Sequence, residues 1–125
     1  MNIHSHINQI AMTKDEKLLA YIKILSDKSR YKIILHLMQK GEVCVCVLSK
    51  KLGLEQTLIS HHLQTLREAG LIQDRKVGTW VHCSLNLKTF KEIESLYQKV
   101  LSPQNIFDNP CVMHGACRLL LTEKQ

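Results

Sequence analysis

The chain has 125 residues, of which 45% are hydrophobic and 22% charged, a composition typical of a single globular domain. An excess of lysine and arginine over acidic residues gives a formal net charge of +6, which favours a polyanionic partner. No apolar run is long enough to span a bilayer and the first residues lack a secretory signal, so we expect a cytoplasmic protein that does not bind a membrane. In that reducing compartment the five cysteines favour metal binding or redox sensing over a disulfide framework.

The first part of the chain is expected to form two helices after a polar arm. Residues 1–13 are polar and irregular, and we expect a mobile N-terminal arm there. From Asp15 apolar residues recur at helical spacing until residues 26–27 interrupt the pattern. Ser29 is then a candidate N-cap for a second helix, which Gly41 is expected to end.

The middle of the chain predicts two short helices followed by a hairpin. The helical segments 46–52 and 56–69 are separated only by a tight turn, so they must cross at a steep angle, as in a helix-turn-helix. Strand alternation then occupies 71–76 and 79–85, and the intervening Val77-Gly78 suits a tight hairpin turn.

A last helix and a tail complete the predicted architecture. Apolar residues recur at helical spacing from Phe90, and Pro103 is expected to end that helix. We therefore expect a mainly α fold with a small β-hairpin wing, a winged helix-turn-helix in the order helix, helix, helix-turn-helix, hairpin, helix. Residues 14–102 would form the DNA-binding and dimerisation domain, and residues 103–125 a cysteine-containing tail.

The second helix of the pair presents a polar face that suits DNA. Its hydrogen-bonding side chains recur every three or four residues and so share one face, which comprises Gln56, Thr57, Ser60, His61, Gln64 and Arg67. Such side chains can contact base edges in the major groove, although an ordinary solvated face has the same pattern. Arg75 and Lys76 beside the hairpin tip add a basic wing that could reach the flanking backbone or minor groove. Together these features favour double-stranded operator DNA as the partner.

Residues 42–85 closely resemble the ArsR/SmtB family of metal-responsive repressors, in the sequence EVCVCVLSKKLGLEQTLISHHLQTLREAGLIQDRKVGTWVHCSL. Within it, SHHLQTLREAGL looks like the family's recognition helix and RKVGTWVHCSL like its wing. The resemblance implies a homodimer that binds an operator and is released when an effector binds. For the dimer we expect a shared face on the first and last long helices, made of Leu18, Ile22, Ile93, Tyr97 and Val100.

Cys44 and Cys46 are the first candidate ligands for the effector, and thiolates suit soft ions such as As(III), Cd(II), Pb(II) or Zn(II). They lie where a helix should begin, and a helix N-terminus lowers the pKa of a thiol. In extended backbone the two side chains would point oppositely, so a local turn is needed to bring both sulfurs onto one ion. Their segment, CVCVL, resembles the family's thiolate motif CVCDL, with Val47 in place of aspartate. Ser49 stands where arsenite-sensing relatives have a third cysteine, and two small buried hydrophobes are the structural alternative.

The tail is the candidate source of further ligands. Cys111, His114 and Cys117 recur every three residues, so neighbours would lie close on a helix. We expect Cys111 or Cys117 to complete the metal site, with His114 as a weaker ligand, and an inert tail is the alternative. Cys83 alternates inward on the second hairpin strand and is expected to fill the core. The last long helix has no histidine, so the zinc site that the family builds there is not expected.

These features favour a transcriptional repressor that leaves its operator when its cysteines bind a thiophilic metal or metalloid ion. An alternative is a repressor of the same fold that senses thiol redox state or reactive sulfur. A third hypothesis is a non-regulatory metal-binding protein, against which the DNA-facing helix argues. An enzyme is not expected, because the chain has no phosphate loop, nucleophile elbow or paired carboxylates in a plausible cleft.

Overall fold

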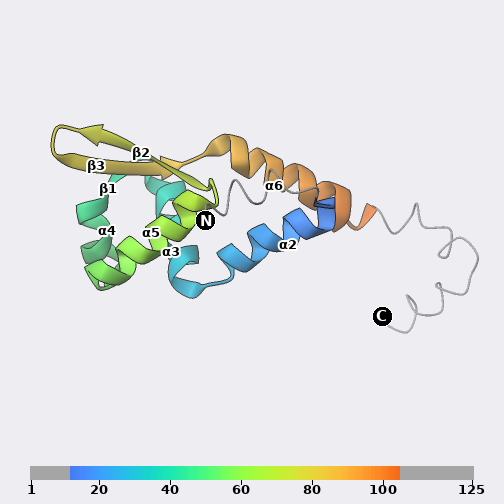
Figure 1. Cartoon of the computed structure of the whole chain (residues 1–125), viewed down its shortest axis with the longest axis horizontal. Coiled ribbons are helices and arrows are strands. Elements are labelled where there is room, and N and C mark those ends of the chain that lie inside the picture. The colour runs from blue at the N-terminus through green and yellow to red at the C-terminus, as the bar shows by residue number, and fades with distance from the viewer. Residues whose placement is uncertain (1–11, 105–125) are drawn as a thin grey trace, which may run out of the picture.

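Helices and one small sheet alternate along the part of the chain that the computed structural model describes, residues 12–104 (Figure 1). The elements follow in the order α2 (Lys14–Leu25), α3 (Lys28–Lys40), β1 (Val43–Cys44), α4 (Val45–Leu52), α5 (Gln56–Glu68), β2 (Ile72–Val77), β3 (Trp80–Leu85) and α6 (Leu87–Val100). Most of the expected N-terminal arm and the tail ligands Cys111, His114 and Cys117 lie outside the described residues. The predicted winged helix-turn-helix architecture is confirmed.

Side-chain caps set the starts of the first two helices. The hydroxyl of Thr13 accepts a hydrogen bond from the Glu16 amide at 3.3 Å, and the Glu16 carboxylate accepts one from the Thr13 amide at 3.1 Å. At α3 the N-cap is Asp27, whose carboxylate accepts from the Arg30 amide at 3.0 Å. The prediction that Ser29 caps this helix was wrong, because the helix begins at Lys28 and places Ser29 inside its first turn. The helix ends as expected at Gly41, which has φ +82°.

The sheet has three strands where the sequence predicted a two-stranded hairpin. Its order is β1-β3-β2, and both neighbouring pairs are antiparallel. The hairpin pairs Ile72 with Leu85 at one end and Val77 with Trp80 at the other, so its turn is Gly78-Thr79, one residue later than expected. The added strand β1 pairs Cys44 with His82 on β3.

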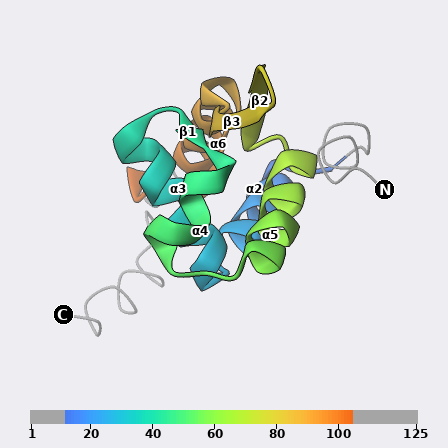
Figure 2. The same cartoon turned by 90° about the vertical axis from the view of Figure 1, so that its left-hand side faces the viewer.

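The core lies between the helices and the inner face of the sheet. Figure 2, viewed from the end that carries the hairpin, shows α4 and α5 below the strands. The largest fully buried side chains come from both layers, and they are Tyr21, Ile33, Leu37, Leu48, Ile59, Leu63, Leu66, Leu71 and Cys83. The expectation that Cys83 fills the core is therefore confirmed.

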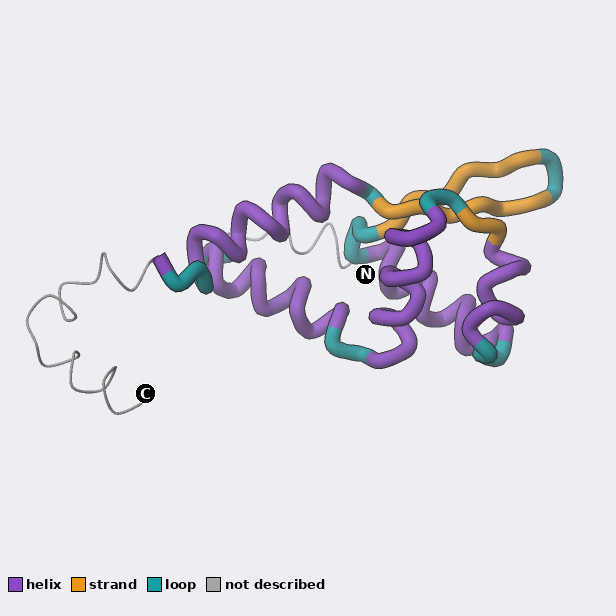
Figure 3. Tube along the Cα trace, turned by 180° about the vertical axis from the view of Figure 1, so that it is seen from behind, coloured by secondary structure: helices purple, strands orange, loops and turns teal. Residues whose placement is uncertain are grey.

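Helices α2 and α6 run side by side and extend away from the helix-turn-helix (Figure 3). Of the residues expected on a dimer face, Ile22 and Tyr97 are exposed, at 43% and 46%. Leu18 is only 3% exposed, so its assignment to a surface was wrong: it packs into the core of its own protomer. Within residues 12–104, no helix combines the length and apolar character needed to cross a membrane.

Candidate DNA-binding surface and thiol pair

The turn between α4 and α5 sets the angle of the helix-turn-helix. Gly53 ends α4 in the left-handed region at φ +63°, where a side chain would add strain. The amide of Leu54 then donates to the Ser49 carbonyl at 3.2 Å, and the Ser49 hydroxyl donates to the Leu54 carbonyl at 2.6 Å. Ser49 thus closes the turn that orients α5.

Helix α5 separates a buried apolar side from an exposed polar side. Its buried residues are Ile59, His62, Leu63 and Leu66, and the candidate DNA-contacting residues Gln56, Thr57, Ser60, His61 and Gln64 are all exposed. His62 is only 7% exposed. Its ring lies between the first turn of α3 and the core: Nε2 is 3.8 Å from the Asp27 carboxylate and Nδ1 is 3.5 Å from Arg30 Nη1. The sequence did not predict those two partners.

The end of α5 is tied to the wing. Arg67 Nε lies 2.7 Å from the Asp74 carboxylate on β2, and Arg67 Nη1 donates to Gln64 Oε1 at 2.7 Å. Gln64 in turn donates to Glu68 at 2.8 Å. The six candidate residues therefore fall into two groups. The first four lie exposed on the early turns of the helix, whereas Gln64 and Arg67 already bond to other side chains of the protein.

Arg75 and Lys76 lie on β2 as expected, and both are exposed. Arg75 also makes two hydrogen bonds to the Glu42 carboxylate, with Nε donating at 3.1 Å, and His82 Nδ1 lies 3.6 Å from the same carboxylate. The hydrogen bonds from Arg75 hold the pKa of Glu42 below its ordinary value. At the wing tip Trp80, 58% exposed, pairs with Val77.

Cys44 and Cys46 lie on either side of the junction between β1 and α4. Cys44 is the last residue of the strand and the N-cap of the helix, and Cys46 is in the first helical turn. This change of direction is the local turn that the pair required, and it brings the Cys44 side chain near enough to act on the Cys46 thiol. This interaction favours the protonated thiol and raises the pKa of Cys46, so the expectation that the helix N-terminus lowers it was wrong. Cys46 is exposed, and the alternative of two buried hydrophobes therefore does not describe it.

Cys83 lies across the sheet in a different environment. Burial, with a smaller contribution from the negative charge of Asp74, raises its pKa to about 11. Its side chain is fully buried, so it cannot join the thiol pair without opening the core. Among residues 12–104 no group of three or more histidine, cysteine, aspartate or glutamate side chains is arranged to hold a metal ion.

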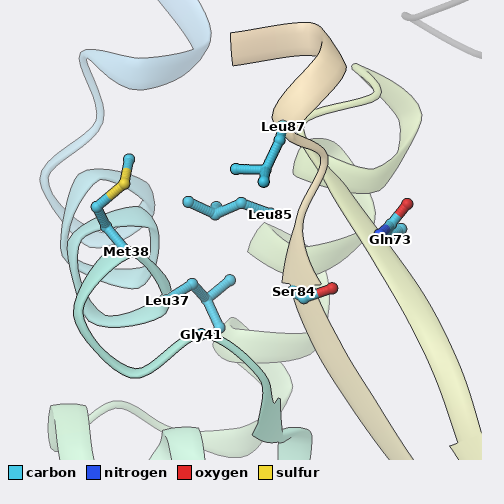
Figure 4. Close-up of a pocket in the computed structure, with 7 residues that line it drawn as sticks. All are labelled: Leu37, Met38, Gly41, Gln73, Ser84, Leu85 and Leu87. Atoms are coloured by element: carbon cyan, nitrogen blue, oxygen red, sulfur yellow. The ribbon is translucent and has the colours of Figure 1, made fainter. Parts of the chain in front are cut away.

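A separate apolar cavity lies between α3 and the base of the hairpin (Figure 4). Its volume is about 400 Å³, and its lining residues are Leu37, Met38, Gly41, Gln73, Ser84, Leu85 and Leu87. The lining contains no thiol and no ionisable side chain. This cavity is therefore not part of the thiol site.

Comparison with known proteins identifies the family. A family profile described as "Bacterial regulatory protein, arsR family" matches residues 27–74. The chain is 52% identical to the arsenical resistance operon repressor of Escherichia coli over 64 residues, which are 51% of this chain and 55% of that protein, or little more than half its length. It is 35% identical to the arsenic resistance transcriptional regulator ArsR1 of Pseudomonas putida over 88 residues, 70% of this chain and 69% of that protein.

Among solved structures, the fold is similar to "Reduced HlyU from Vibrio cholerae N16961", with 28% identity, a TM-score of 0.56, and coverage of 71% of this chain and 95% of that one. The family profile thus spans the helix-turn-helix, from the N-cap of α3 to the first residues of β2. The chain belongs to the arsR family of bacterial regulatory proteins, and it is a winged helix-turn-helix DNA-binding transcriptional regulator rather than an enzyme.

Proposed function

We propose that this protein represses transcription from an operator and leaves that operator when a thiophilic metal or metalloid ion binds Cys44 and Cys46. The observation that carries the proposal is the contact between the two thiols at the start of α4, the helix that packs against α5. The two relatives named for arsenic resistance favour As(III) among the soft ions, and Cd(II), Pb(II) and Zn(II) are the other candidates.

The chemistry of the pair suits a soft cation. The Cys46 thiol already interacts with the Cys44 side chain, and an ion that binds both sulfurs would replace that interaction and release the thiol protons. The position also suits regulation: Cys44 pairs with His82 on the wing strand, and Cys46 belongs to the supporting helix. An ion that bridges them ties the sheet to α4. Release from DNA follows if the ion binds the DNA-free arrangement more tightly than the bound one.

The described residues supply two thiolates, whereas soft ions of this class prefer three or more sulfur ligands. The Ser49 hydroxyl is already committed to the Leu54 carbonyl, and Cys83 is buried. We therefore propose that Cys111 or Cys117 of the tail completes the site, with His114 as a weaker ligand. The test is a chain that ends after Pro103, and equal ion affinity in this form and in the intact chain would show that the tail contributes no ligand.

For DNA binding we propose a cytoplasmic homodimer whose two α5 helices enter successive major grooves, about 34 Å apart on an inverted-repeat operator. The exposed parts of α2 and α6, including Ile22 and Tyr97, would form the shared face with Ile93 and Val100. The contacting residues would be Gln56, Thr57, Ser60, His61, Gln64, Arg67, Arg75 and Lys76. Replacing Gln56, Ser60 or His61 by alanine should weaken operator binding by about 1–3 kcal/mol more than binding to random DNA. Sedimentation that shows a monomer with full operator affinity would contradict the dimer.

The central experiment measures release from DNA. Cys44→Ser and Cys46→Ser should each bind operator normally and fail to leave it when As(III), Cd(II) or Pb(II) is added. Cys83→Ala is the matched control, since it removes a thiol from the same sheet and should leave the response unchanged. If either serine variant still responds fully to every ion, the sensor lies elsewhere in the molecule.

A second candidate function is a repressor that senses oxidants or reactive sulfur. The contact between the Cys44 and Cys46 thiols favours it, as does the similarity to a regulator whose solved structure is described as reduced. Treatment with a mild peroxide would then oxidise a pair of thiols to a disulfide, while the peroxide is reduced, and would lower the affinity for the operator. Mass analysis of the oxidised protein separates this function from ion binding, which leaves the thiols recoverable with a chelator.

A further inference from the structure

Glu42 links the wing to the segment that carries the thiol pair. Its carboxylate accepts two hydrogen bonds from Arg75 on β2 and lies 3.6 Å from the His82 ring on β3. Arg75 and His82 are direct partners in the hairpin, and His82 is also the partner of Cys44 on β1. Because side chains alternate along strands, these groups share the outer face of the sheet, opposite the buried Cys83.

We propose that Glu42 is an intramolecular competitor for DNA phosphate: it holds Arg75 in the DNA-free protein and must release it before Arg75 can contact the DNA backbone. A guanidinium uses the same planar fork of donors for a carboxylate as for a phosphate, so the two contacts exclude each other. This inference rests on the DNA-binding role proposed above for the wing, and it does not depend on the identity of the effector.

The exposure of the pair makes the exchange feasible. The Arg75 side chain is 65% exposed and that of Glu42 is 32% exposed, so a phosphate can approach the guanidinium from solvent. Ion pairs in such positions are weak in water, and a polyanion such as duplex DNA can therefore displace the carboxylate. While the pair persists, Glu42 cancels one of the two basic charges on β2, and Lys76 supplies the other.

The contact therefore weakens binding to every DNA sequence to a similar degree. A phosphate contact carries no sequence information, and its loss removes one released counterion from the binding equilibrium. The residue before Arg75 on β2 makes a second carboxylate-arginine pair, in which the Asp74 carboxylate lies 2.7 Å from Nε of Arg67 on α5.

The test uses the full chain and a fluorescein-labelled duplex of random sequence, of about 30 base pairs, because phosphate contacts do not require the operator. Glu42→Gln should bind this duplex about 3- to 10-fold tighter, and the slope of log K against log salt should become more negative by about 0.9. In an Arg75→Gln background the same substitution should change affinity by less than about twofold. In a Lys76→Gln background the full gain should persist, since Lys76 does not bind Glu42.

The possible outcomes separate the explanations. A gain that survives in the Arg75→Gln background would mean that Glu42 acts only as a diffuse negative charge and would overturn the proposal. Unchanged or weaker binding by Glu42→Gln would also overturn it, because the carboxylate would then position Arg75 for DNA instead of withholding it. If Lys76→Gln and Arg75→Gln both bind like the original protein, the wing itself does not contact DNA, and this inference fails with it. Glu42→Ser replaces Glu42→Gln in the same series if circular dichroism shows that the glutamine variant is misfolded.

Discussion

The thiol pair at the junction of β1 and α4 and the buried Cys83 on the neighbouring strand β3 have different chemistry. Cys83 pairs with Val43, the residue directly before Cys44. Because side chains alternate along a strand, the side chain of Cys44 lies on the opposite face of the sheet from that of Cys83. The pKa is raised for both Cys46 and Cys83, by the interaction of the Cys46 thiol with the Cys44 side chain in one and by burial in the other. An ion can replace the proton of the first, whereas it has no access to the second. A raised thiol pKa therefore does not by itself separate an accessible candidate ligand from a buried thiol, and the cause of the shift must also be known.

The largest expected difference between the two environments is in reactivity. With iodoacetamide at pH 8 we expect Cys46 to be alkylated more than about 100-fold faster than Cys83, since the buried thiol is both protonated and inaccessible. Peptide mapping by mass spectrometry gives both rates in one sample, and unfolding in urea provides the control, because it should make the rates similar. Equal rates in the folded protein would show that the sheet opens readily around Cys83.

A substitution at Ser49 tests whether the thiol pair lacks one ligand. Ser49→Cys places a third thiol at the position where arsenite-sensing relatives of the family have one, and it should raise As(III) affinity by about 10-fold or more. The same change removes the hydroxyl that donates to the Leu54 carbonyl, so Ser49→Ala is the matched control for that loss. In the Ser49→Cys variant, removal of the tail should no longer alter affinity. An unchanged affinity would mean that residue 49 does not lie near the bound ion.

The smallest effects concern stability. Cys83→Ala should lower the free energy of unfolding by about 1 kcal/mol through lost packing, and Cys46→Ala should change it by less than about 0.5 kcal/mol.

The pH dependence of the same unfolding measurement isolates the buried thiol. The pKa of Cys83 is raised in the folded state, from an ordinary value of 9.0 to about 11, so its contribution is fully present below pH 9 and is lost as the pH rises toward 11. Burial also raises the pKa of Tyr21 to about 12, and the loss from this tyrosine overlaps the same range. The difference between the original chain and Cys83→Ala therefore isolates Cys83, and parallel curves for the two proteins would contradict its assigned environment.

Periodic features of the fold could be predicted from the sequence, whereas features that depend on distant partners could not. The helix spacing of α3, α5 and α6, the alternation on β3 and the inward position of Cys83 all follow from local patterns. Strand β1 has only two residues, which is too short for any period, and it exists because β3 offers an edge to Val43 and Cys44. The cap of α3 is also local, yet the prediction chose Ser29 where the structure has Asp27, two residues earlier.

The candidate site shows the same division. The polar face of α5 and the position of the thiol pair could be predicted, because both are local in sequence. The ion pairs of Arg67 with Asp74 and of Arg75 with Glu42 could not, since the second joins residues 33 positions apart. The pKa of Cys46 was predicted in the wrong direction, because the effect of the neighbouring Cys44 side chain outweighs the lowering effect of the backbone at the helix start.

Trp80 gives the wing an optical signal of its own. It is the single tryptophan of the chain, and it lies exposed at the hairpin tip opposite Val77. The indole emission of the protein therefore originates from one place, in contact with water, and nucleobases that approach the tip should quench it. An ion bound at Cys44 and Cys46 has no indole beside it, so any change in emission that it causes must be transmitted along β3. The tryptophan emission of the unlabelled protein, excited where tyrosine does not absorb, thus follows the wing alone.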